Sequence, residues 1–469
     1  MMFFSRRAIV AAGLAATLAG CNKPETFPEL GQGFSGPIAL ARDDGGTNFY
    51  VLNTDFERQF NSGSVLVVKE DGTKVNAVPV PRMGRSLTVG GSRMLLTFDK
   101  ADQNGRNLVW LMDVSTPELP VFKAEFEIDC TPMNAIIRKN YQYFAVTCAG
   151  GDLWVGTLAA DLSQSTLSRV RSYGRTRRAL YLDTKRGLLL AFPTDTAKQV
   201  SSDGTYEDKR TFTTDTFIES AGANEIPDEF EKDKRSSRQH RELRSTYQFV
   251  VYNVAAEALK GFPYAGDDKT FKAELRWLYY TLTNPQGWPD GNSLDPNVKN
   301  YRTNIWEARA NPSDPDSFYI SHRGYRKSQY ANNIVKVAIT GDLTNAALPT
   351  SQVMTFERVF GFGGEVDDKS FPSDFAITTV DGQELVVINH FRDLVYWKPE
   401  ERLFAIEAKA LGGSFWRTRN YVSDNYTRSY YQLAINQKGR AMTLSYYGNS
   451  VFVIDVRPGL DITEVTEVR

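Results

Sequence analysis

Cysteine and histidine, which carry much of the chemistry of enzymes and metal sites, are scarce in this chain of 469 residues, which has three of each. The motifs G-x-S-x-G, H-E-x-x-H, the P-loop and the haem-attachment C-x-x-C-H are absent. No sequence signature therefore assigns the chain to a class of enzyme. An enzyme stays an alternative, because active sites often assemble from loops that lie far apart in the sequence.

An excess of charge of one sign is also missing. The formal net charge is −1, and it becomes −3 when a leader containing Arg6 and Arg7 is removed, since 53 basic residues then face 56 acidic ones. No overall field draws such a protein to nucleic acid or to anionic lipid. We expect no nucleic-acid partner, and any electrostatic recognition must be local.

Long hydrophobic runs are missing beyond residue 20, so no later segment is expected to span a membrane. The composition, with 41% hydrophobic and 24% charged residues, is typical of a folded globular protein rather than of a disordered one. The first twenty residues differ from the rest.

The N-terminus has the three parts of a bacterial export signal. Ser5-Arg6-Arg7 supplies positive charge, residues 8–19 are apolar, and the segment ends in Leu18-Ala19-Gly20-Cys21. Small residues followed by cysteine resemble the lipobox of bacterial lipoproteins. The resemblance implies a signal peptide over residues 1–20 and a mature chain that begins at Cys21, with acyl chains such as palmitate attached there. An uncleaved membrane helix is disfavoured, because this apolar run is too short to span a bilayer.

Two details of this segment concern export and destination. Ser-Arg-Arg-x-Ile-Val resembles the twin-arginine export pattern, although an ordinary secretory signal also fits. Asn22 stands where many lipoproteins of the inner membrane have aspartate, so the resemblance implies a lipid-anchored protein of the outer membrane, on its periplasmic or its surface side. Two or three acyl chains anchor stably, because each buried CH₂ contributes about 0.8 kcal/mol.

Cys130 and Cys148 remain once Cys21 is acylated. They flank an expected hairpin that turns near Lys139-Asn140, which places them almost opposite each other on two strands. The exported compartment permits disulfides, so we predict a bond between them, with two buried free thiols as the alternative.

Four strand positions recur along the chain in a fixed order. The first strand of each repeat is predicted at 37–42, 85–90, 133–138, 177–183, 305–310, 373–380 and 430–436. The second strand ends in an aliphatic residue and a small one, at Leu52-Asn53, Leu96-Thr97, Val146-Thr147, Leu190-Ala191, Ile320-Ser321, Ile388-Asn389 and Leu444-Ser445. A third strand follows each of these, and a fourth is clearest at 121–128, 352–359 and 462–468.

These seven copies predict an all-β fold, a seven-bladed β-propeller with long inserted loops. The third strands enter at Val65, Leu108 and Leu153 in the first three copies, and spacings of 43 and 45 residues match the length of a four-stranded blade. Radial closure leaves each sheet only short edges. The alternatives are a large β-sandwich or two stacked β domains.

Two segments resemble repeats of known bacterial propellers. Asn107–Phe126, with Leu-Val-Trp-Leu-Met-Asp-Val, looks like the LVIVD repeat, and Asn449–Pro458, with Ser-Val-Phe-Val-Ile-Asp-Val, resembles the YVTN type. The resemblance covers two of seven copies and implies fold rather than activity. The predicted organisation is a lipidated tether at 21–36 and a propeller at 37–469.

Two insertions interrupt the repeats. The first, 196–246 in blade four, holds a charge-dense run at 221–245 in which acidic residues precede basic ones. A solvated helix or loop and a docking arm are both open there. The second, 284–303 between blades four and five, is rich in turn residues and contains Trp288.

Arginines recur in the loops that lead into the first strand of each blade. We predict that they form an arginine rim around the central channel and receive an acidic partner surface, because the guanidinium fork suits carboxylate and phosphate groups. An anionic glycan is an alternative ligand, and pairing with nearby acids such as Glu365, Asp367 and Asp368 is the alternative without a ligand. The candidate partner-binding residues are Arg82, Arg85, Arg175, Arg177, Arg178, Trp288, Arg302, Trp416, Arg417 and Arg419.

Metal and catalytic candidates are weak. His322 and His390 occupy the same position in two different blades, where other blades place unrelated residues, so we expect strand-end residues rather than ligands. Residues 100–105 faintly resemble a calcium loop, but Lys100 stands where the first acid should be. No cofactor, metal site or catalytic residue is predicted, and calcium binding stays open.

The expected function is that of a membrane-anchored propeller that binds a protein partner in a complex of the cell envelope. Arginine and aromatic residues in the long loops favour an interface. The alternative is a periplasmic enzyme, a lactonase-like hydrolase or an oxidoreductase, with its site in the central channel.

Overall fold

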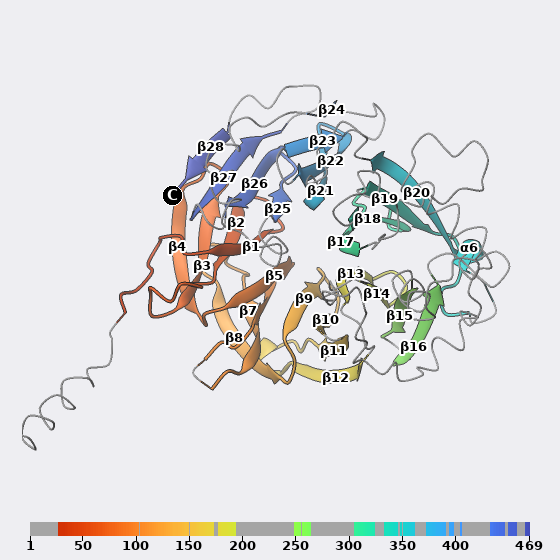
Figure 1. Ribbon diagram of the computed structural model, residues 1–469, viewed down its shortest axis with the longest axis horizontal. Coiled ribbons are helices and arrows are strands. Elements are labelled where there is room, and N and C mark those ends of the chain that lie inside the picture. The colour runs from red at the N-terminus through yellow and green to blue at the C-terminus, as the bar shows by residue number, and fades with distance from the viewer. Residues whose placement is uncertain are drawn as a thin grey trace, which may run out of the picture.

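The computed structural model describes residues 27–102, 104–149, 151–172, 177–193, 248–254, 256–263, 304–323, 333–345, 348, 350–361, 372–390, 394–397, 404–405, 432–445, 449–456 and 465–469. These residues form seven antiparallel four-stranded sheets, each built from four consecutive strands. We number the sheets as blades one to seven in chain order. They lie in this order around a central axis, so the β-propeller predicted from the sequence is confirmed (Figure 1).

Blades one to three contain twelve strands: β1 (Pro37–Arg42), β2 (Asn48–Asn53), β3 (Gly63–Lys69), β4 (Lys74–Val80), β5 (Gly84–Gly90), β6 (Arg93–Phe98), β7 (Asn107–Asp113), β8 (Val121–Ile128), β9 (Pro132–Ile137), β10 (Tyr143–Cys148), β11 (Asp152–Thr157) and β12 (Thr166–Ser172). Blades four and five contain β13 (Arg177–Asp183), β14 (Leu188–Pro193), β15 (Gln248–Asn253), β16 (Ala258–Pro263), β17 (Asn304–Ala310), β18 (Ser317–Arg323), β19 (Asn333–Ile339) and β20 (Met354–Gly361). Blades six and seven contain β21 (Pro372–Val380), β22 (Gln383–His390), β23 (Leu394–Trp397), β24 (Phe404–Ala405), β25 (Leu433–Ile435), β26 (Arg440–Ser445), β27 (Ser450–Asp455) and β28 (Val465–Val468).

Short helical segments accompany the strands at η1 (Leu162–Gln164) and α6 (Thr350–Val353). In the described part of the chain, no helix is long and apolar enough to cross a membrane.

The ring closes where blade one meets blade seven. Phe49 and Val51 of β2 share one apolar cluster with Ala434 and Met442 of blade seven. At the outer edge, Lys74 Nζ donates to the backbone oxygen of the C-terminal residue at 2.6 Å. Figure 1 shows this end of the chain beside β4. The first and the last blade are therefore joined by direct contacts, as closure of a propeller requires.

The place of a strand within its blade decides its residue pattern. β2 is buried at every position, because it lies between two strands of its own sheet and between two neighbouring blades. It accordingly has a continuous apolar run, Phe-Tyr-Val-Leu, rather than strict alternation. β8, the outermost strand of blade two, has exposed Val121, Phe122, Glu125 and Glu127. Burial of the side chains thus decreases from the inner strands to the outermost strand, and the apolar core lies between neighbouring blades.

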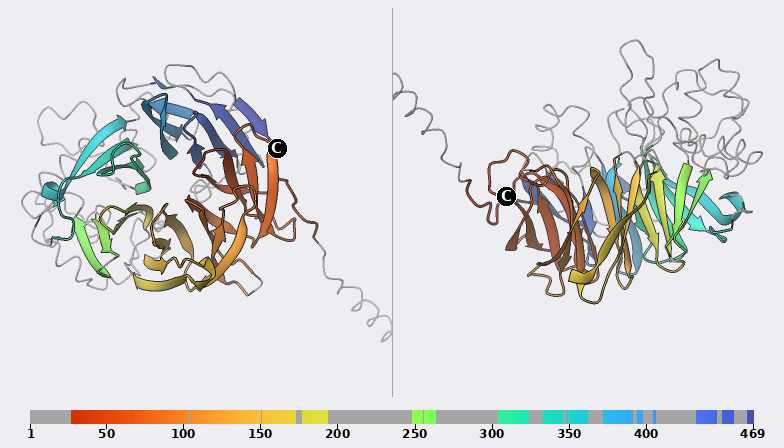
Figure 2. Two further views of the ribbon diagram at one scale, coloured as in Figure 1. Left: turned by 180° about the vertical axis from the view of Figure 1, so that it is seen from behind. Right: turned by 90° about the horizontal axis from the view of Figure 1, so that it is seen from below.

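The ring has two faces. Connections from a second to a third strand, and from one blade to the next, leave by one face, which we call the loop face; the others leave by the opposite turn face (Figure 2). On the loop face, strands of blades four to seven are separated by 194–247, 264–303 and 406–432. Connections on the turn face are shorter: 43–47 and 184–187 are typical, and the longest is 340–353, which contains α6. The strand ends that these three long stretches connect therefore all lie at one face of the ring.

A β-bulge recurs where the first strand of a blade begins at the loop face. The register shifts between Gly84 and Ser86, between Arg177 and Ala179, and between Ile305 and Ala308. A bulge leaves a residue outside the ladder and redirects its side chain. Arg178 and Glu307 occupy such positions, which matters for the site below.

The N-terminal boundary of the propeller differs from the prediction. Residues 30–36 were assigned to the tether, but Leu30 and Phe34 are buried, and the amides of Thr54 and Asp55 donate to the backbone oxygens of Gly36 and Ser35 at 3.1 Å. Phe34 joins the apolar cluster between blades one and seven. Burial of this ring makes the segment part of the fold, so the propeller begins before β1 and includes residues that the prediction assigned to the tether.

Strand bounds follow the sequence pattern closely in several blades. The predicted strands 37–42, 177–183 and 121–128 have the bounds of β1, β13 and β8, whereas the strand predicted at 430–436 is the shorter β25. The signal peptide with Cys21, the insertion 196–246 and the loop 284–303 lie outside the described residues.

Candidate functional site on the loop face

Asp55 organises the loop face of blade one. It follows β2 with φ of 45°, a left-handed conformation that aspartate tolerates better than most residues. Its carboxylate is fully buried, accepts the amides of Gln59 at 2.9 Å and Phe60 at 3.1 Å, and forms an ion pair with Arg82 Nε at 3.1 Å. Arg82 also donates to the Phe60 oxygen. This residue of the predicted arginine rim therefore holds a loop of its own chain.

Arg85 has a similar role in blade two. Its guanidinium lies 2.5 Å from Asp99 Oδ2, on the loop that follows β6. Asp99 is buried, whereas the Arg85 side chain is 37% exposed. The pair joins the start of the first strand to the end of the second strand of the same blade. One side of the Arg85 guanidinium faces solvent, but the Asp99 carboxylate already balances its charge.

Arg178, the third rim candidate whose side chain is described, lies in the protein interior. Its Nε and Nη2 donate to Glu307 Oε1 at 3.0 and 2.9 Å, and its guanidinium lies 4.3 Å from the centre of the Trp306 ring. The bulge in β13 turns this side chain out of the ladder toward blade five. Only 6% of Arg178 is exposed, so it joins two blades rather than presenting a charge on the surface.

The ion pair of Arg178 extends into a longer chain of charges. Arg309 donates to Glu307 Oε2 at 3.0 Å, to Asp374 Oδ1 at 2.7 Å and to the Phe375 oxygen at 3.2 Å. Asp374 in turn accepts the amide of Leu433 in blade seven at 2.8 Å. We call Arg178, Glu307, Arg309 and Asp374 the inner-strand charge cluster. It connects the first strands of blades four, five, six and seven.

Burial and pairing set the electrostatics of this cluster. Glu307 and Asp374 are 2% and 1% exposed. Burial raises the pKa of Asp374 to about 6, against the opposing influence of the Arg309 cation. For Arg309, burial disfavours the cation, but Asp374 and Glu307 outweigh this and raise the pKa of the guanidinium. Two cations face two anions in this cluster. The arrangement therefore fits a structural link between blades better than a catalytic acid or base.

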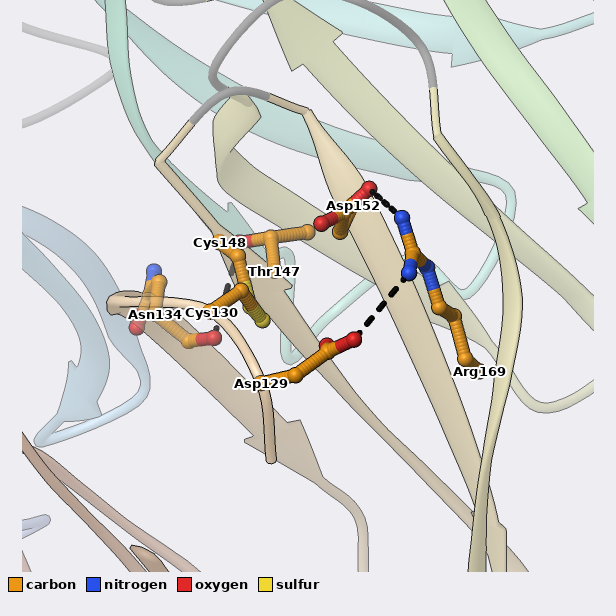
Figure 3. Close-up of a disulfide and its surroundings, with 7 residues drawn as sticks. All are labelled: Asp129, Cys130, Asn134, Thr147, Cys148, Asp152 and Arg169. Carbon is orange, nitrogen blue, oxygen red and sulfur yellow. Dashed lines mark hydrogen bonds and ion pairs between the residues drawn. A yellow bond between two sulfur atoms is a disulfide. The ribbon is translucent and has the colours of Figure 1, made fainter. Parts of the chain in front are cut away.

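Blade three brings two carboxylates together beside the disulfide (Figure 3). Cys130 and Cys148 are bonded, with sulfur atoms 2.06 Å apart and Cα atoms 5.8 Å apart. Asp129, Cys130 and Asp152 have potential ligand atoms within 4.8 Å of one another. The sulfur is used in the disulfide, however, and Arg169 bridges Asp129 at 3.2 Å and Asp152 at 2.8 Å. A single guanidinium thus pairs with both carboxylates and offsets one of their two charges, so the oxygens that face it are already used within the protein.

The faint calcium motif is also occupied by protein groups. Asp102 accepts the amides of Asn104 and Arg106 at 3.0 Å and pairs with Arg106 Nε at 2.6 Å. Hydrogen bonds from Arg106 hold the pKa of the Asp102 carboxyl below its usual value. The aspartate therefore closes a turn of the loop.

Other candidate residues cannot be placed in this site. Arg175, Trp288, Arg302, Trp416, Arg417 and Arg419 lie outside the described residues, and so do the side chains of Arg177, His322 and His390. Sequence reasoning missed Glu307, Arg309 and Asp374. The signal for them was charged residues inside first strands that otherwise are apolar, as in Ile305-Trp306-Glu307-Ala308-Arg309.

Comparisons with known proteins show the fold. No family model matches the chain, and no curated protein matches its sequence. Among solved structures, the β-propeller domain of Cps50 (Swd1) from Myceliophteria thermophila is similar, with a TM-score of 0.50 and 9% identity over 90% of this chain and 98% of that domain. Sqt1 from Saccharomyces cerevisiae has a TM-score of 0.48 and 9% identity over 94% of this chain and 87% of its own. At this identity the likeness identifies a β-propeller and nothing finer.

Proposed function

We propose that this chain is a seven-bladed, lipid-anchored propeller that binds a partner protein at its loop face, within a complex of the bacterial cell envelope. One observation carries the proposal. The stretches 194–247, 264–303 and 406–432 are all added on the same face of the ring, between strands of blades four to seven. Loops that a rigid frame presents together on one side are a common way to build a binding surface.

The described side chains support a frame rather than a reaction centre. Arg82, Arg85 and Arg178 are matched by Asp55, Asp99 and Glu307. Their charges hold loops and blades in place, so recognition falls to the added loops. Those loops contain Trp288, Trp416, Arg417 and Arg419, residue types that contribute disproportionately to the binding energy of protein interfaces.

The anchor is proposed from the first residues of the chain. An apolar run that ends in Leu18-Ala19-Gly20-Cys21 supports lipidation at Cys21, and Asn22 supports placement in the outer membrane. The acyl chains of a lipoprotein hold it at the bilayer surface. A propeller held there is placed to assemble with other envelope proteins.

The proposal is tested by purification of the full lipidated chain in mild detergent through a C-terminal tag, with the stoichiometry of the recovered proteins determined by mass spectrometry. We expect one or a few envelope proteins in whole-number ratio. The combined variant W416A, R417S and R419S should lose them.

The matched control removes charge from the turn face. Lys139→Ser and Lys438→Ser change side chains that are 62% exposed and paired with Asp44 and Glu70. Exposed pairs contribute only about 0–1 kcal/mol, so this variant should fold and keep its partner. A lipoprotein recovered alone, from wild type as well as from variants, would contradict the proposal and favour the enzyme alternative.

A further inference from the structure

The first described residues are fixed firmly to blade one. We call residues 28–36 the N-terminal strap. The Pro28 oxygen accepts the amide of Asn61 at 3.0 Å, and the Gly33 oxygen accepts Asn53 Nδ2 at 3.3 Å. Gly36 donates to Asn449 Oδ1 of blade seven at 2.7 Å. With Phe34 buried between these blades, the strap fixes the point at which the chain leaves the propeller.

That point lies at the loop face of blade one. Phe27 stacks on Arg82, whose guanidinium carbon is 5.3 Å from the ring centre. Arg82 is bound to Asp55 and to the Phe60 oxygen, both in the connection between β2 and β3. The chain therefore leaves beside the loop 54–62 and at the outside of the ring, as the first part of the ribbon shows in Figure 2.

The distance to the proposed lipid is short. Only residues 22–26 separate Cys21 from Phe27. A fully extended chain spans about 3.3–3.6 Å per residue, so the linker reaches roughly 20 Å at most. An acylated Cys21 would thus hold the loop-face corner of blade one close to the bilayer, because the linker is too short to let the propeller move far from it.

Exposed aromatic rings lie at this corner. Phe27 is 39% exposed and Phe56 is 45% exposed. Phe56 follows the buried Asp55, which fixes its loop, so the ring is presented by a rigid backbone. The exposed charged neighbours Glu29, Glu57 and Arg58 sum to one negative charge. An apolar contact with the interface of a bilayer therefore fits better than attraction to anionic headgroups.

We propose that the corner formed by Phe27 and Phe56, the aromatic corner, rests in the interfacial layer of the membrane and orients the propeller on it. The inference rests on the lipid anchor proposed above. Each ring that is removed from water strengthens the attachment to the membrane through the hydrophobic effect. With blade one at the bilayer, the described strands of blades four and five lie on the far side of the ring, away from the membrane contact (Figure 1).

The test uses the full lipidated chain in vesicles of phosphatidylethanolamine and phosphatidylglycerol. A nitroxide spin label is placed at Phe56→Cys, since Cys130 and Cys148 are bonded and Cys21 would be acylated. The control label is placed at Phe122→Cys. Phe122 is also 45% exposed, but it lies at the turn-face end of β8 in blade two. Power-saturation spectra compare access of oxygen, which concentrates in lipid, with access of a water-soluble nickel chelate.

The proposal predicts that the label at residue 56 favours oxygen and the label at residue 122 favours nickel. Flotation of the vesicles tests the lipid anchor separately from the aromatic corner. Protein that does not float with the vesicles contradicts the anchor. Protein that floats while both labels favour nickel confirms the anchor and overturns the aromatic corner, and the same holds if the label at 56 is shielded from both reagents by a bound protein.

Discussion

The interface between blades one and two and the interface between blades five and six join equivalent sheets by different means. Blades one and two share a single apolar cluster in which Leu52 and Val65 pack with Leu87 and Leu96. Between blades five and six, described contacts are polar: Arg309 binds Asp374, and Tyr319 Oη donates to Glu384 at 2.9 Å. Among the described side chains, no apolar cluster joins these two blades.

The difference shows that propeller geometry does not prescribe the chemistry between blades. An apolar interface tolerates any filling of the right volume, whereas buried charges require specific partners. The charged interface lies on the side of the ring that holds the long insertions. The inner-strand charge cluster, to which this pair belongs, also joins the first strands of blades four and seven, which adjoin those insertions.

Removal of the cation at the charged interface should have the largest effect. Arg309→Met removes the cation that binds Asp374 and leaves, among the described residues, the amides of Phe375 and Leu433 as its partners. Loss of one member of a buried pair costs about 3–5 kcal/mol. Denaturant unfolding monitored by circular dichroism measures the change. Arg169→Met is the matched control, since Arg169 also bridges two carboxylates but is 45% exposed, so its loss should cost no more than about 1 kcal/mol. Equal losses in the two variants would contradict the importance of burial.

Truncation at the apolar interface should come next. Leu96 is fully buried in the cluster of blades one and two, and Leu→Ala changes in cores cost about 2–5 kcal/mol. The same unfolding measurement applies. Leu119→Ala, at a side chain that is 57% exposed, provides the comparison and should change the free energy of unfolding very little. A loss at Leu119 as large as that at Leu96 would count against the assignment of this core.

The double variant R309M and D374N should be less destabilised than the sum of its single variants. The asparagine removes the buried anion that Arg309→Met leaves unpaired, and its amide oxygen can still accept the Leu433 amide that Asp374 accepts. Contacting charges couple by about 0.5–3 kcal/mol in such a cycle. Double-mutant analysis of unfolding free energies measures the coupling. Strict additivity would mean that the two residues stabilise the interface independently.

The smallest expected effect is a pH dependence of the free energy of unfolding that arises from Asp374 at the charged interface. Because burial raises the pKa of Asp374 from the ordinary 3.8 to about 6, the folded protein binds this proton more tightly than the unfolded chain does. The contribution of Asp374 to stability is therefore present below pH 4 and is lost as pH rises toward about 6. Asp374→Asn should remove that slope, measured as the free energy of unfolding at pH steps between 4 and 7. An unchanged slope would assign it to other groups.

Fold and site differ in how much the sequence could predict. The repeated strands were predictable, because Leu52-Asn53, Leu96-Thr97 and their equivalents mark buried strand ends that any blade needs. Arg82 lies just before β5, and Arg85 and Arg178 lie near the starts of β5 and β13. Their partners were not predicted. Glu307 is 129 residues from Arg178, and only closure of the ring brings the two together.

The strap was missed for a related reason. Residues 28–36 lack the alternation of a strand, and only the presence of blade seven beside blade one provides the apolar site for Phe34. The local residue pattern predicts strands whose hydrogen bonds and burial are completed within one sheet. It does not predict segments whose burial depends on two sheets that are distant in the sequence.

Site-specific photo-crosslinking in intact cells tests the central claim most directly, that the ring is a frame whose loop face holds a partner protein. A photoreactive residue replaces Trp416, in the stretch 406–432 between β24 and β25, and, in a second strain, Phe122 on the outermost strand of blade two. The account predicts a discrete crosslinked envelope protein from position 416 and none from position 122. Crosslinks of the same protein from both positions, or from neither, would contradict it.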